Sequence, residues 1–349
     1  MTSIPPEQGE VRRPTIRDVA KHAGVSKSLV SLVLQGSDQV SPARRGAVLQ
    51  AMEQIGYRPN AAARSLSARR TGTIGVLLSH LRNPWIVDLL DGLHPILHEH
   101  GLRMLFGDGR LNQRTDESLI QTFLEMRVDG LVLVGTIPIS PAIAQIAGEV
   151  PTVIASSRDI DLPSVDTIAA DDWRGAESAT RHLIELGHTR IAHISGRGVV
   201  GAIRRQAYEE TMRACGLEDD IAVEAGDGGE EGAYRAAVKL LSGGKRPTAI
   251  FASNDMSCIG ALSAADDVGV RTPEELSLVG YDNTYLARLR HLWLTSVDPA
   301  NEEVGRRAGR ALLARIDDPL RQAHVDLVEP SLQVRGSTVP IPGASSPTT

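Results

Sequence analysis

Apolar and polar positions near the start of the chain alternate with the period of a short helix. Ile16, Val19, Ala20 and Ala23 recur at i, i+3, i+4 and i+7, so they form one apolar stripe along a helix. Thr15 stands directly before this stripe, where a hydroxyl side chain can cap the helix. The pattern predicts a first short amphipathic helix.

A second helix is predicted over residues 27–34. Ser26 can cap it through its hydroxyl group. The leucines and valines of the SLVSLVL run form its inner face, which leaves Lys27, Ser28 and Ser31 near the outer face and the N-terminal end. A recognition helix reads the major groove of DNA from this position.

A third helix is predicted to begin near Pro42 and to end at Gly56. Proline suits the first turn of a helix, and glycine after the last turn stops it. Val48 and Ala51 form its buried side. Three short helices around one core predict a compact helix-turn-helix unit over residues 14–58, although any amphipathic helix pair with a glycine between them shares part of this pattern.

From Thr73 onward, short apolar runs alternate with longer amphipathic stretches. The expected strands are residues 73–78, 102–106, 130–134, 151–155, 190–194, 249–252 and 277–281, and the expected later helices are near 173–186, 203–215, 230–242 and 256–268. This alternation is typical of βα units that build parallel sheets. The chain is therefore expected to be α/β, with an N-terminal all-α helix-turn-helix domain and a body of two parallel-sheet lobes.

The pattern also suggests where the parts of the chain begin and end. Residues 59–72 are expected to form a hinge helix and linker, residues 73–165 the first lobe, and residues 166–292 the second. Residues 1–13 and the Pro-, Ser- and Thr-rich residues 337–349 are expected to be disordered tails.

Composition limits the cellular setting. Cys215 and Cys258 are too few for a disulfide framework, and the start MTSIPPEQGE lacks the basic and apolar segments of a secretory signal. No apolar run approaches the roughly 18 residues that a membrane span needs. A cytoplasmic protein that does not cross a membrane is expected.

Charge is divided unevenly along the chain. The formal net charge is −6, but residues 1–72 hold 11 Lys and Arg against 5 Asp and Glu, a net of +6, so the remainder carries −6 − 6 = −12. A basic N-terminal segment joined to an acidic body fits a protein that contacts DNA phosphates only through that segment.

Three stretches resemble a known family nearly position by position. TIRDVAKHAGVS, SLVLQGS and GYRPNAAARSLSARRTGTIGVL are similar to the N-terminal region of the LacI/GalR family of bacterial transcriptional regulators, over roughly sixty residues. The resemblance implies a repressor that binds pseudo-palindromic double-stranded operator DNA as a homodimer. It also implies a periplasmic-binding-protein-like body in which the chain crosses between lobes three times, so that residues 293–319 return to the first lobe and residues 324–336 belong to the second.

The segment after the third helix is expected to fold only with a partner. Asn60 can cap an alanine-rich helix that includes Ala63 and Leu66, but so short a helix is unstable alone in water. In the family, the corresponding hinge helices pair in the minor groove, and Leu66 stands at the position of the leucine that wedges between base pairs. A plain linker leucine is the alternative.

One departure from the family affects the expected DNA contacts. Leu32 stands where members usually place an arginine that reads the operator. Lys27 and Ser28 are therefore expected to make the main base contacts, and Leu32 could contact a thymine methyl group. The full expected DNA-binding set is Thr15, Lys27, Ser28, Ser31, Leu32, Asn60, Ala63 and Leu66.

Small ligands of α/β proteins bind beyond the carboxyl ends of the strands, so residues that follow strands are candidates. The resemblance places Arg204 on an arginine that clamps ligand hydroxyl groups, and Asp282 on an acceptor for them. The expected effector-binding set is Trp85, Arg158, Asp171, Arg204, Asn254 and Asp282. Trp85 could instead only pack the start of its helix, and Asp171 could serve the helix dipole.

A sugar-like effector that moves the lobes and thereby the hinge helices is the expected allosteric control. Gly228 replaces an aromatic residue, and Ser157 stands where an acidic residue is common, so the ligand is not expected to be an ordinary hexose. These departures keep open a regulator driven by a protein partner. A solute-binding protein would need a signal peptide and would have no use for residues 14–66.

Enzymatic chemistry is not expected. The chain has no nucleophile elbow, phosphate loop or dinucleotide fingerprint in the right context. His94 and His98 are four residues apart, but Pro95 is expected to disturb their helix and no third ligand is evident. No metal, cofactor or catalytic residue is therefore expected.

Overall fold

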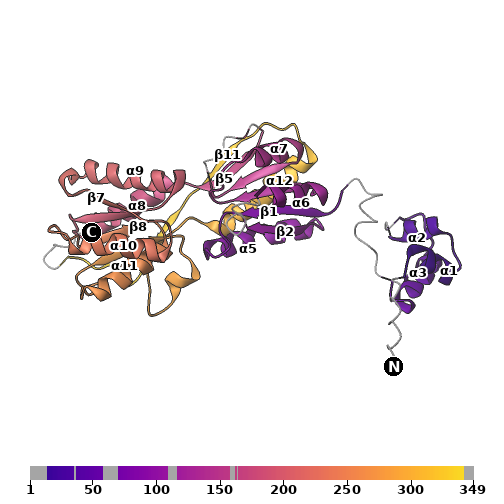
Figure 1. Cartoon of the computed structure of the whole chain (residues 1–349), viewed down its shortest axis with the longest axis horizontal. Coiled ribbons are helices and arrows are strands. Elements are labelled where there is room, and N and C mark those ends of the chain that lie inside the picture. Colours follow the sequence, from indigo (N-terminus) through magenta and orange to yellow (C-terminus); the bar gives the residue numbers. More distant parts are fainter. Residues whose placement is uncertain are drawn as a thin grey trace, which may run out of the picture. The chain divides into compact units, whose positions relative to one another are not determined.

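The computed structural model describes residues 14–34, 37–57, 70–108, 116–157, 162 and 164–341. The chain divides into two compact units, one ending at Thr71 and one beginning at Gly72. Figure 1 shows an all-helical N-terminal unit and a second unit built from two α/β lobes. Among the described residues, no helix is long and apolar enough to cross a membrane.

The N-terminal unit contains α1 (Ile16–His22), α2 (Lys27–Leu34) and α3 (Pro42–Gln54), which confirms the three predicted helices. Gly24 forms the turn between α1 and α2 with a φ of 63°. The Ser26 hydroxyl oxygen caps α2 by accepting a hydrogen bond from the backbone N–H of Leu29 at 3.2 Å. The common core consists of Val19, Ala20, Val30, Val33, Val40, Val48 and Ala51.

The first lobe contains a six-stranded parallel sheet in the order β11-β5-β4-β3-β1-β2. Its strands are β1 (Thr73–Leu78), β2 (Arg103–Asp108), β3 (Gly130–Val134), β4 (Thr152–Ala155), β5 (Asp166–Ala170) and β11 (Val325–Val328). The side chains of β1 alternate between two cores: Ile74, Val76 and Leu78 contribute to one, and Leu77 to the other. Both faces of the sheet are therefore covered by helices.

Four helices cover this sheet. α5 (Trp85–Glu99) and α12 (Asn301–Asp317) pack on one face, and α6 (Asp116–Glu125) and α7 (Pro141–Glu149) pack on the other. α5 and α12 approach each other through glycines. An added Cβ atom at Gly92 would lie 1.9 Å from the carbonyl oxygen of Glu302, and one at Gly305 would lie 2.0 Å from that of Leu89. Only glycine permits this separation of the two backbones.

The second lobe contains a six-stranded sheet in the order β12-β10-β9-β8-β6-β7, in which only the edge strand β12 is antiparallel. Its strands are β6 (Ile191–Ser195), β7 (Ala222–Ala225), β8 (Ala249–Ala252), β9 (Ser277–Tyr281), β10 (Thr295–Asp298) and β12 (Ser331–Gln333). Helices α8 (Asp172–Glu185) and α9 (Gly198–Ala214) cover one face, and α10 (Glu230–Ser242) and α11 (Asp255–Asp267) the other. Short 3-10 helices span Glu218–Asp220 and Tyr285–Arg288.

The chain passes between the lobes three times, as the resemblance implies. These crossings run from β5 to α8, from β10 to α12, and from β11 to β12. The expected boundaries need correction, however. Residues 166–170 belong to the first sheet, because β5 pairs with β4 and β11. β10 belongs to the second sheet through its pairing with β9, and β11 belongs to the first.

The expected disordered tail also needs correction, because residues 337–341 pack on the second lobe. The backbone N–H of Leu278 donates to the carbonyl of Ser337 at 2.7 Å, and the Ser337 hydroxyl donates to the carbonyl of Leu278 at 2.6 Å. The backbone N–H of Ile341 donates to Leu186 at 3.0 Å. The Ser337 hydroxyl thus satisfies a backbone carbonyl of β9, which composition alone could not reveal. Residues 342–349 and 1–13 lie outside the described residues.

Candidate functional site

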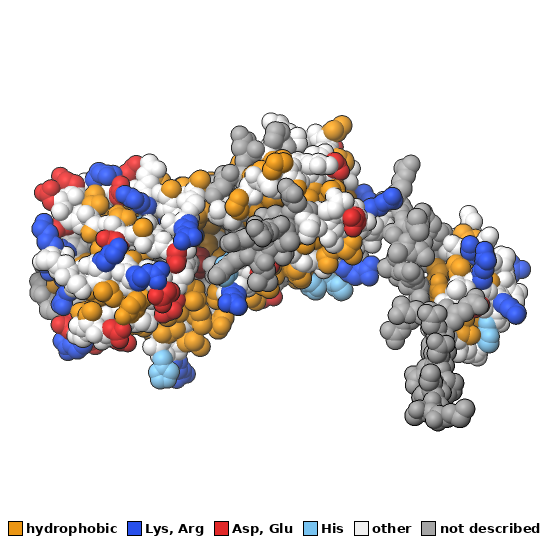
Figure 2. All heavy atoms as spheres, in the orientation of Figure 1, with side chains coloured by type: hydrophobic (Ala, Val, Ile, Leu, Met, Phe, Trp, Pro, Cys, Tyr) orange, Lys and Arg blue, Asp and Glu red, His pale blue; other side chains and the backbone are white. Residues whose placement is uncertain are grey.

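The expected DNA-reading side chains lie at the start of α2. Lys27 and Ser28 are exposed in its first turn, while Ser31 and Leu32 are half-buried. Leu32 packs against the core of the unit, so its side chain also has a structural role. Thr15 is exposed before α1, and its hydroxyl donates to the Asp18 carboxylate at 2.7 Å. Figure 2 shows basic side chains on the surface of this unit.

Four predicted site residues cannot be placed. Asn60, Ala63 and Leu66 of the expected hinge helix, and the effector candidate Arg158, lie outside the described residues. Their roles stay predictions.

Arg204 is the centre of a buried polar cluster in the second lobe. Its Nε and Nη2 atoms lie 2.9 and 2.8 Å from the same Asp172 carboxylate oxygen, and its Nη1 donates to the carbonyl of Ser253 at 2.6 Å. Its guanidinium carbon lies 3.4 Å from the ring centroid of Tyr281. Asp172 begins α8, Ser253 follows β8 and Tyr281 ends β9, so the cluster lies where secondary structure elements meet at the carboxyl ends of strands.

Asp282 lies beside the Arg204–Asp172 pair but is farther from the guanidinium group than Asp172 is. Its carboxylate oxygen is 3.9 Å from Nη1 of Arg204, whose charge is already balanced by Asp172. Burial raises the pKa of Asp282 to about 7; Arg204 opposes this shift, and Asp255, Asp172 and Asp88 add to it. The Asp282 carboxyl group therefore changes its protonation state near neutral pH.

The same electrostatics connects the two lobes. Asp88 belongs to α5 of the first lobe, yet its charge contributes to the raised pKa of Asp282 in the second. Burial raises the pKa of Asp88 itself, and Arg288 of the second lobe opposes that shift. Asp282 of the Arg204 cluster therefore lies within electrostatic range of the first lobe.

Two adjacent aspartates at the start of α8 have different roles. The Asp171 carboxylate caps the helix by accepting from the backbone N–H of Arg174 at 3.2 Å. Asp172, which was not in the expected effector-binding set, is 5% exposed and pairs with Arg204. The sequence contained a signal, namely two aspartates at a strand-to-helix junction. It did not show which one would be the cap, and the part of Asp171 in effector binding stays a prediction.

Asn254 and Trp85 are held by their own elements. Asn254 caps α11 by accepting from the backbone N–H of Ser257 at 2.8 Å, and its Nδ2 donates to the carbonyl of Gly228 at 2.9 Å. Trp85 is partly buried against the core between α5, α12 and the sheet. Trp85 thus has the packing role that was its alternative, and Asn254 has a capping role. The part of both residues in effector binding stays a prediction.

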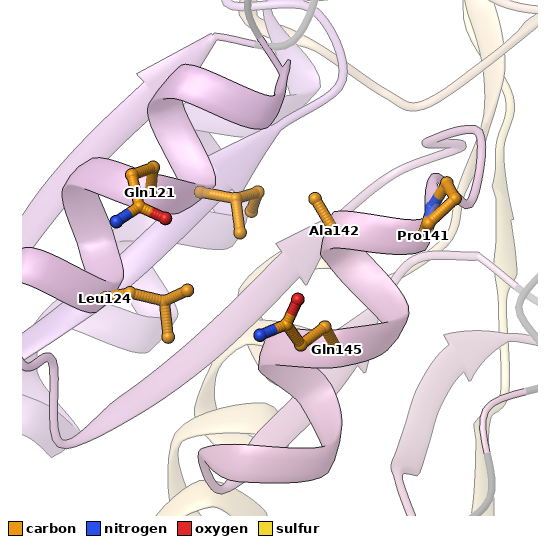
Figure 3. A pocket seen from close by; sticks show the side chains of 6 residues that line it. Gln121, Leu124, Pro141, Ala142 and Gln145 are labelled. Atoms are coloured by element: carbon orange, nitrogen blue, oxygen red, sulfur yellow. The ribbon is translucent and has the colours of Figure 1, made fainter.

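A separate hollow lies between α6 and α7 (Figure 3). It is lined by Ile120, Gln121, Leu124, Pro141, Ala142 and Gln145. These lining residues include amide and apolar side chains but no ionisable group, and they come from helices that cover one face of the first sheet. The arrangement offers no chemistry that distinguishes a ligand.

The two histidines of α5 lie against each other. The rings of His94 and His98 stack with centroids 5.4 Å apart. The helix continues through Pro95, contrary to the expected disturbance. Across the described part of the chain, no group of three or more His, Cys, Asp or Glu side chains could hold a metal ion.

Comparisons with known proteins match both units. Residues 15–60 match the model of bacterial regulatory proteins of the lacI family, and residues 180–338 match that of a periplasmic binding protein-like domain. The HTH-type transcriptional regulator CelR of Thermobifida fusca is 34% identical over 336 residues, which cover 93% of this chain and 98% of the relative. The ribose operon repressor of Escherichia coli strain K12 is 33% identical, covering 93% and 99%.

A solved structure extends the similarity to the fold. The complex of the transcriptional regulator CelR with cellobiose has a TM-score of 0.69 and 32% identity, and the match covers 93% of this chain and 100% of that one.

Proposed function

Because this chain belongs to the LacI family of bacterial regulatory proteins, we propose that it is a homodimeric repressor whose binding to a pseudo-palindromic operator is controlled by a small polyhydroxylated effector. The DNA-binding half of this proposal rests on the N-terminal unit, where α2 exposes Lys27 and Ser28 at its first turn. Side chains at this end of a recognition helix contact base edges in the major groove.

The Arg204 cluster carries the effector half of the proposal. Asp172 and Tyr281 fix the guanidinium group, and Asp282 lies beside it at the end of the same sheet. A guanidinium next to a carboxyl group offers donors and an acceptor to neighbouring hydroxyl groups.

Charge narrows the ligand class. The charges of Asp255, Asp172 and Asp88 all act on Asp282, so an anionic ligand at Asp282 would meet repulsion, whereas a hydroxyl-rich neutral ligand can donate to its carboxyl group. The CelR relative was solved with cellobiose, and another relative is named for the ribose operon. We therefore propose neutral sugars or nucleosides ahead of sugar phosphates.

The proposal is tested with full-length protein in two steps. Duplexes selected from a random DNA library should share a pseudo-palindromic sequence. Thermal shift should then detect binding from a panel that contains cellobiose, ribose, ribose 5-phosphate and cytidine, and a ligand at 100 times its dissociation constant adds about 2.7 kcal/mol. A selected operator whose affinity changes with a neutral hit supports the proposal. An operator without any responsive compound favours control by a protein partner.

Replacing Lys27 with alanine is expected to weaken binding to the selected operator by about tenfold to hundredfold, because a base contact contributes roughly 1–3 kcal/mol. Fluorescence anisotropy with the selected duplex and with a scrambled duplex measures the change. Lys239→Ala in α10 is the matched control, since it removes the same charge from the other unit. Equal affinities for Lys27→Ala and Lys239→Ala would exclude Lys27 from the interface.

Asp282 predicts a pH-dependent stability. Its pKa is about 7 in the folded protein against an ordinary value of 3.8, so the folded state keeps a proton that the unfolded state loses. The contribution of this group to the free energy of unfolding therefore falls as pH rises from about 4 to 7. As pH rises from 5 to 8, the free energy of unfolding of Asp282→Asn should increase relative to that of wild type by on the order of 2 kcal/mol.

Urea unfolding at both pH values measures this gain. Asp219→Asn is the control, because Asp219 is exposed in the second lobe and loses the same formal charge. A gain that is equal in the two variants would show that Asp282 is not the group responsible.

A further inference from the structure

Three consecutive residues after β9 are bound to neighbouring elements. The backbone N–H of Asp282 donates to the carbonyl of Val297 at 2.9 Å. The backbone N–H of Asn283 donates to the hydroxyl of Ser296 at 3.1 Å. The backbone N–H and the hydroxyl of Thr284 both donate to the Asp255 carboxylate, at 2.7 and 2.8 Å. The loop that carries Asp282 is therefore fixed against β10 and α11.

The side chain of Asn283 extends this connection to the second crossing between the lobes. Its Nδ2 donates to Asp298 at 2.9 Å, and its Oδ1 accepts from Nη2 of Arg335 at 2.5 Å. Asp298 is the last residue of β10, and its other carboxylate oxygen accepts from the backbone N–H of Ala300 at 2.7 Å. Asn283 thus uses both the oxygen and the nitrogen of its amide, and the Asp298 carboxylate links it to the backbone of Ala300.

Ala300 is the point at which the chain enters the first lobe. It lies between β10 and α12 and has a left-handed backbone with φ of 56° and ψ of 47°. A residue other than glycine holds this conformation only where its surroundings fix it. The Asp298 carboxylate supplies one such restraint, and α12 continues directly from Ala300 into the core of the first lobe.

We infer that Asn283 is a positioning residue that couples Asp282 to the second crossing. Through Asn283 and Asp298, the orientation of the loop that carries Asp282 sets the backbone of Ala300 and thus the start of α12. This inference rests on the proposed function: a ligand hydroxyl group that binds Asp282 changes the relative position of the lobes by this route.

Hydrogen exchange of the full-length, ligand-free protein tests this coupling. Asn283→Asp keeps the acceptor for Arg335 but removes the donor and puts a second carboxylate beside Asp298. Exchange of the Ala300 amide should then become at least tenfold faster. The double variant combines Asn283→Asp with Asp298→Asn. The amide then at position 298 donates to the carboxylate at position 283, and its oxygen still accepts from the Ala300 N–H. Exchange of the Ala300 amide should therefore return to within about twofold of wild type.

Two further variants complete the comparison. Asn283→Gly suits the φ of 47° at this position and removes the side chain without adding charge, so it should also accelerate exchange. Gln145→Glu on α7 adds one charge to the exposed surface of the first lobe and should leave exchange unchanged. Wild-type exchange in both Asn283 variants, or no recovery in the folded double variant, overturns the inference.

The ligand arm uses cellobiose and ribose at saturating concentration. A bound sugar should change exchange at Ala300 in wild type and in the double variant, but not in Asn283→Asp. If neither sugar binds to wild type, the proposed function loses support for these two compounds, while the ligand-free comparison still decides the role of Asn283. If a sugar binds and alters Ala300 equally in all variants, the coupling does not pass through Asn283.

Discussion

Replacing Arg204 with methionine is expected to lower the free energy of unfolding by about 3 kcal/mol and to remove binding of any polyhydroxylated effector. The Asp172 side chain is 5% exposed and receives two contacts from the guanidinium group. Without Arg204, this carboxylate stays buried with no cation beside it, and the carbonyl of Ser253 also loses a donor. Urea unfolding followed by tryptophan fluorescence measures the loss.

The double variant Arg204→Met with Asp172→Asn separates stability from binding. Neutralising the stranded carboxylate should recover at least half of the lost free energy, because a buried amide costs less than a buried charge. Effector binding should not recover, since the guanidinium donors are still missing. A single variant that is less than about 1 kcal/mol below wild type would contradict a tight buried pair. A double variant that binds the effector normally would remove Arg204 from the site.

Replacing Gly92 with alanine is expected to destabilise the first lobe by about 3 kcal/mol. The new methyl group would lie 1.9 Å from the carbonyl oxygen of Glu302 and 2.7 Å from its carbonyl carbon. These are backbone atoms of α12, which cannot rotate away as a side chain can. The two helices must separate, and this opens the core that contains Leu89 and Leu93. Thermal unfolding monitored by circular dichroism measures the effect.

Gly148→Ala is the matched control. It makes the same substitution in a helix of the same lobe, where an added Cβ meets no atom within 4 Å. Alanine should leave stability unchanged or raise it by up to about 1 kcal/mol, because it favours the helical state over glycine. Similar unfolding temperatures for the two variants would mean that α5 and α12 are farther apart than their glycines indicate.

The local pattern of apolar and polar residues predicted most of the helices and strands, because each of them is determined mainly by its own residues. The apolar spacing of residues 27–34 gave α2 with its observed ends, and the buried run at 249–252 gave β8. Each of these elements leaves a local signal: α2 has an apolar stripe with helical spacing, and β8 has a continuous apolar run. Arg204 and Asp282 were placed by resemblance to a family, and the structure brings them within 3.9 Å of each other.

Assignments that depend on distant partners could not be predicted. β11 exposes two of its four residues, and its place in the first sheet is set by pairing with β5. A short strand that alternates little can join either sheet until its neighbours are known. Asp172 was left out of the expected set in favour of Asp171 for a related reason, since its partner Arg204 is 32 positions away and no local pattern connects them.

The three crossings between the lobes determine the order in which parts of the protein can fold during synthesis. The helical unit is complete once residue 57 has been synthesised, so it can fold while the ribosome is still translating the body. Neither sheet is complete at that stage or for long afterwards, because α12 and β11 of the first lobe and β10 and β12 of the second come from residues 295–333. A nascent chain that stops short of this segment therefore carries the three folded helices of the N-terminal unit without a complete lobe in the body. Such a fragment has the side chains of α2 but no complete lobe through which an effector can act.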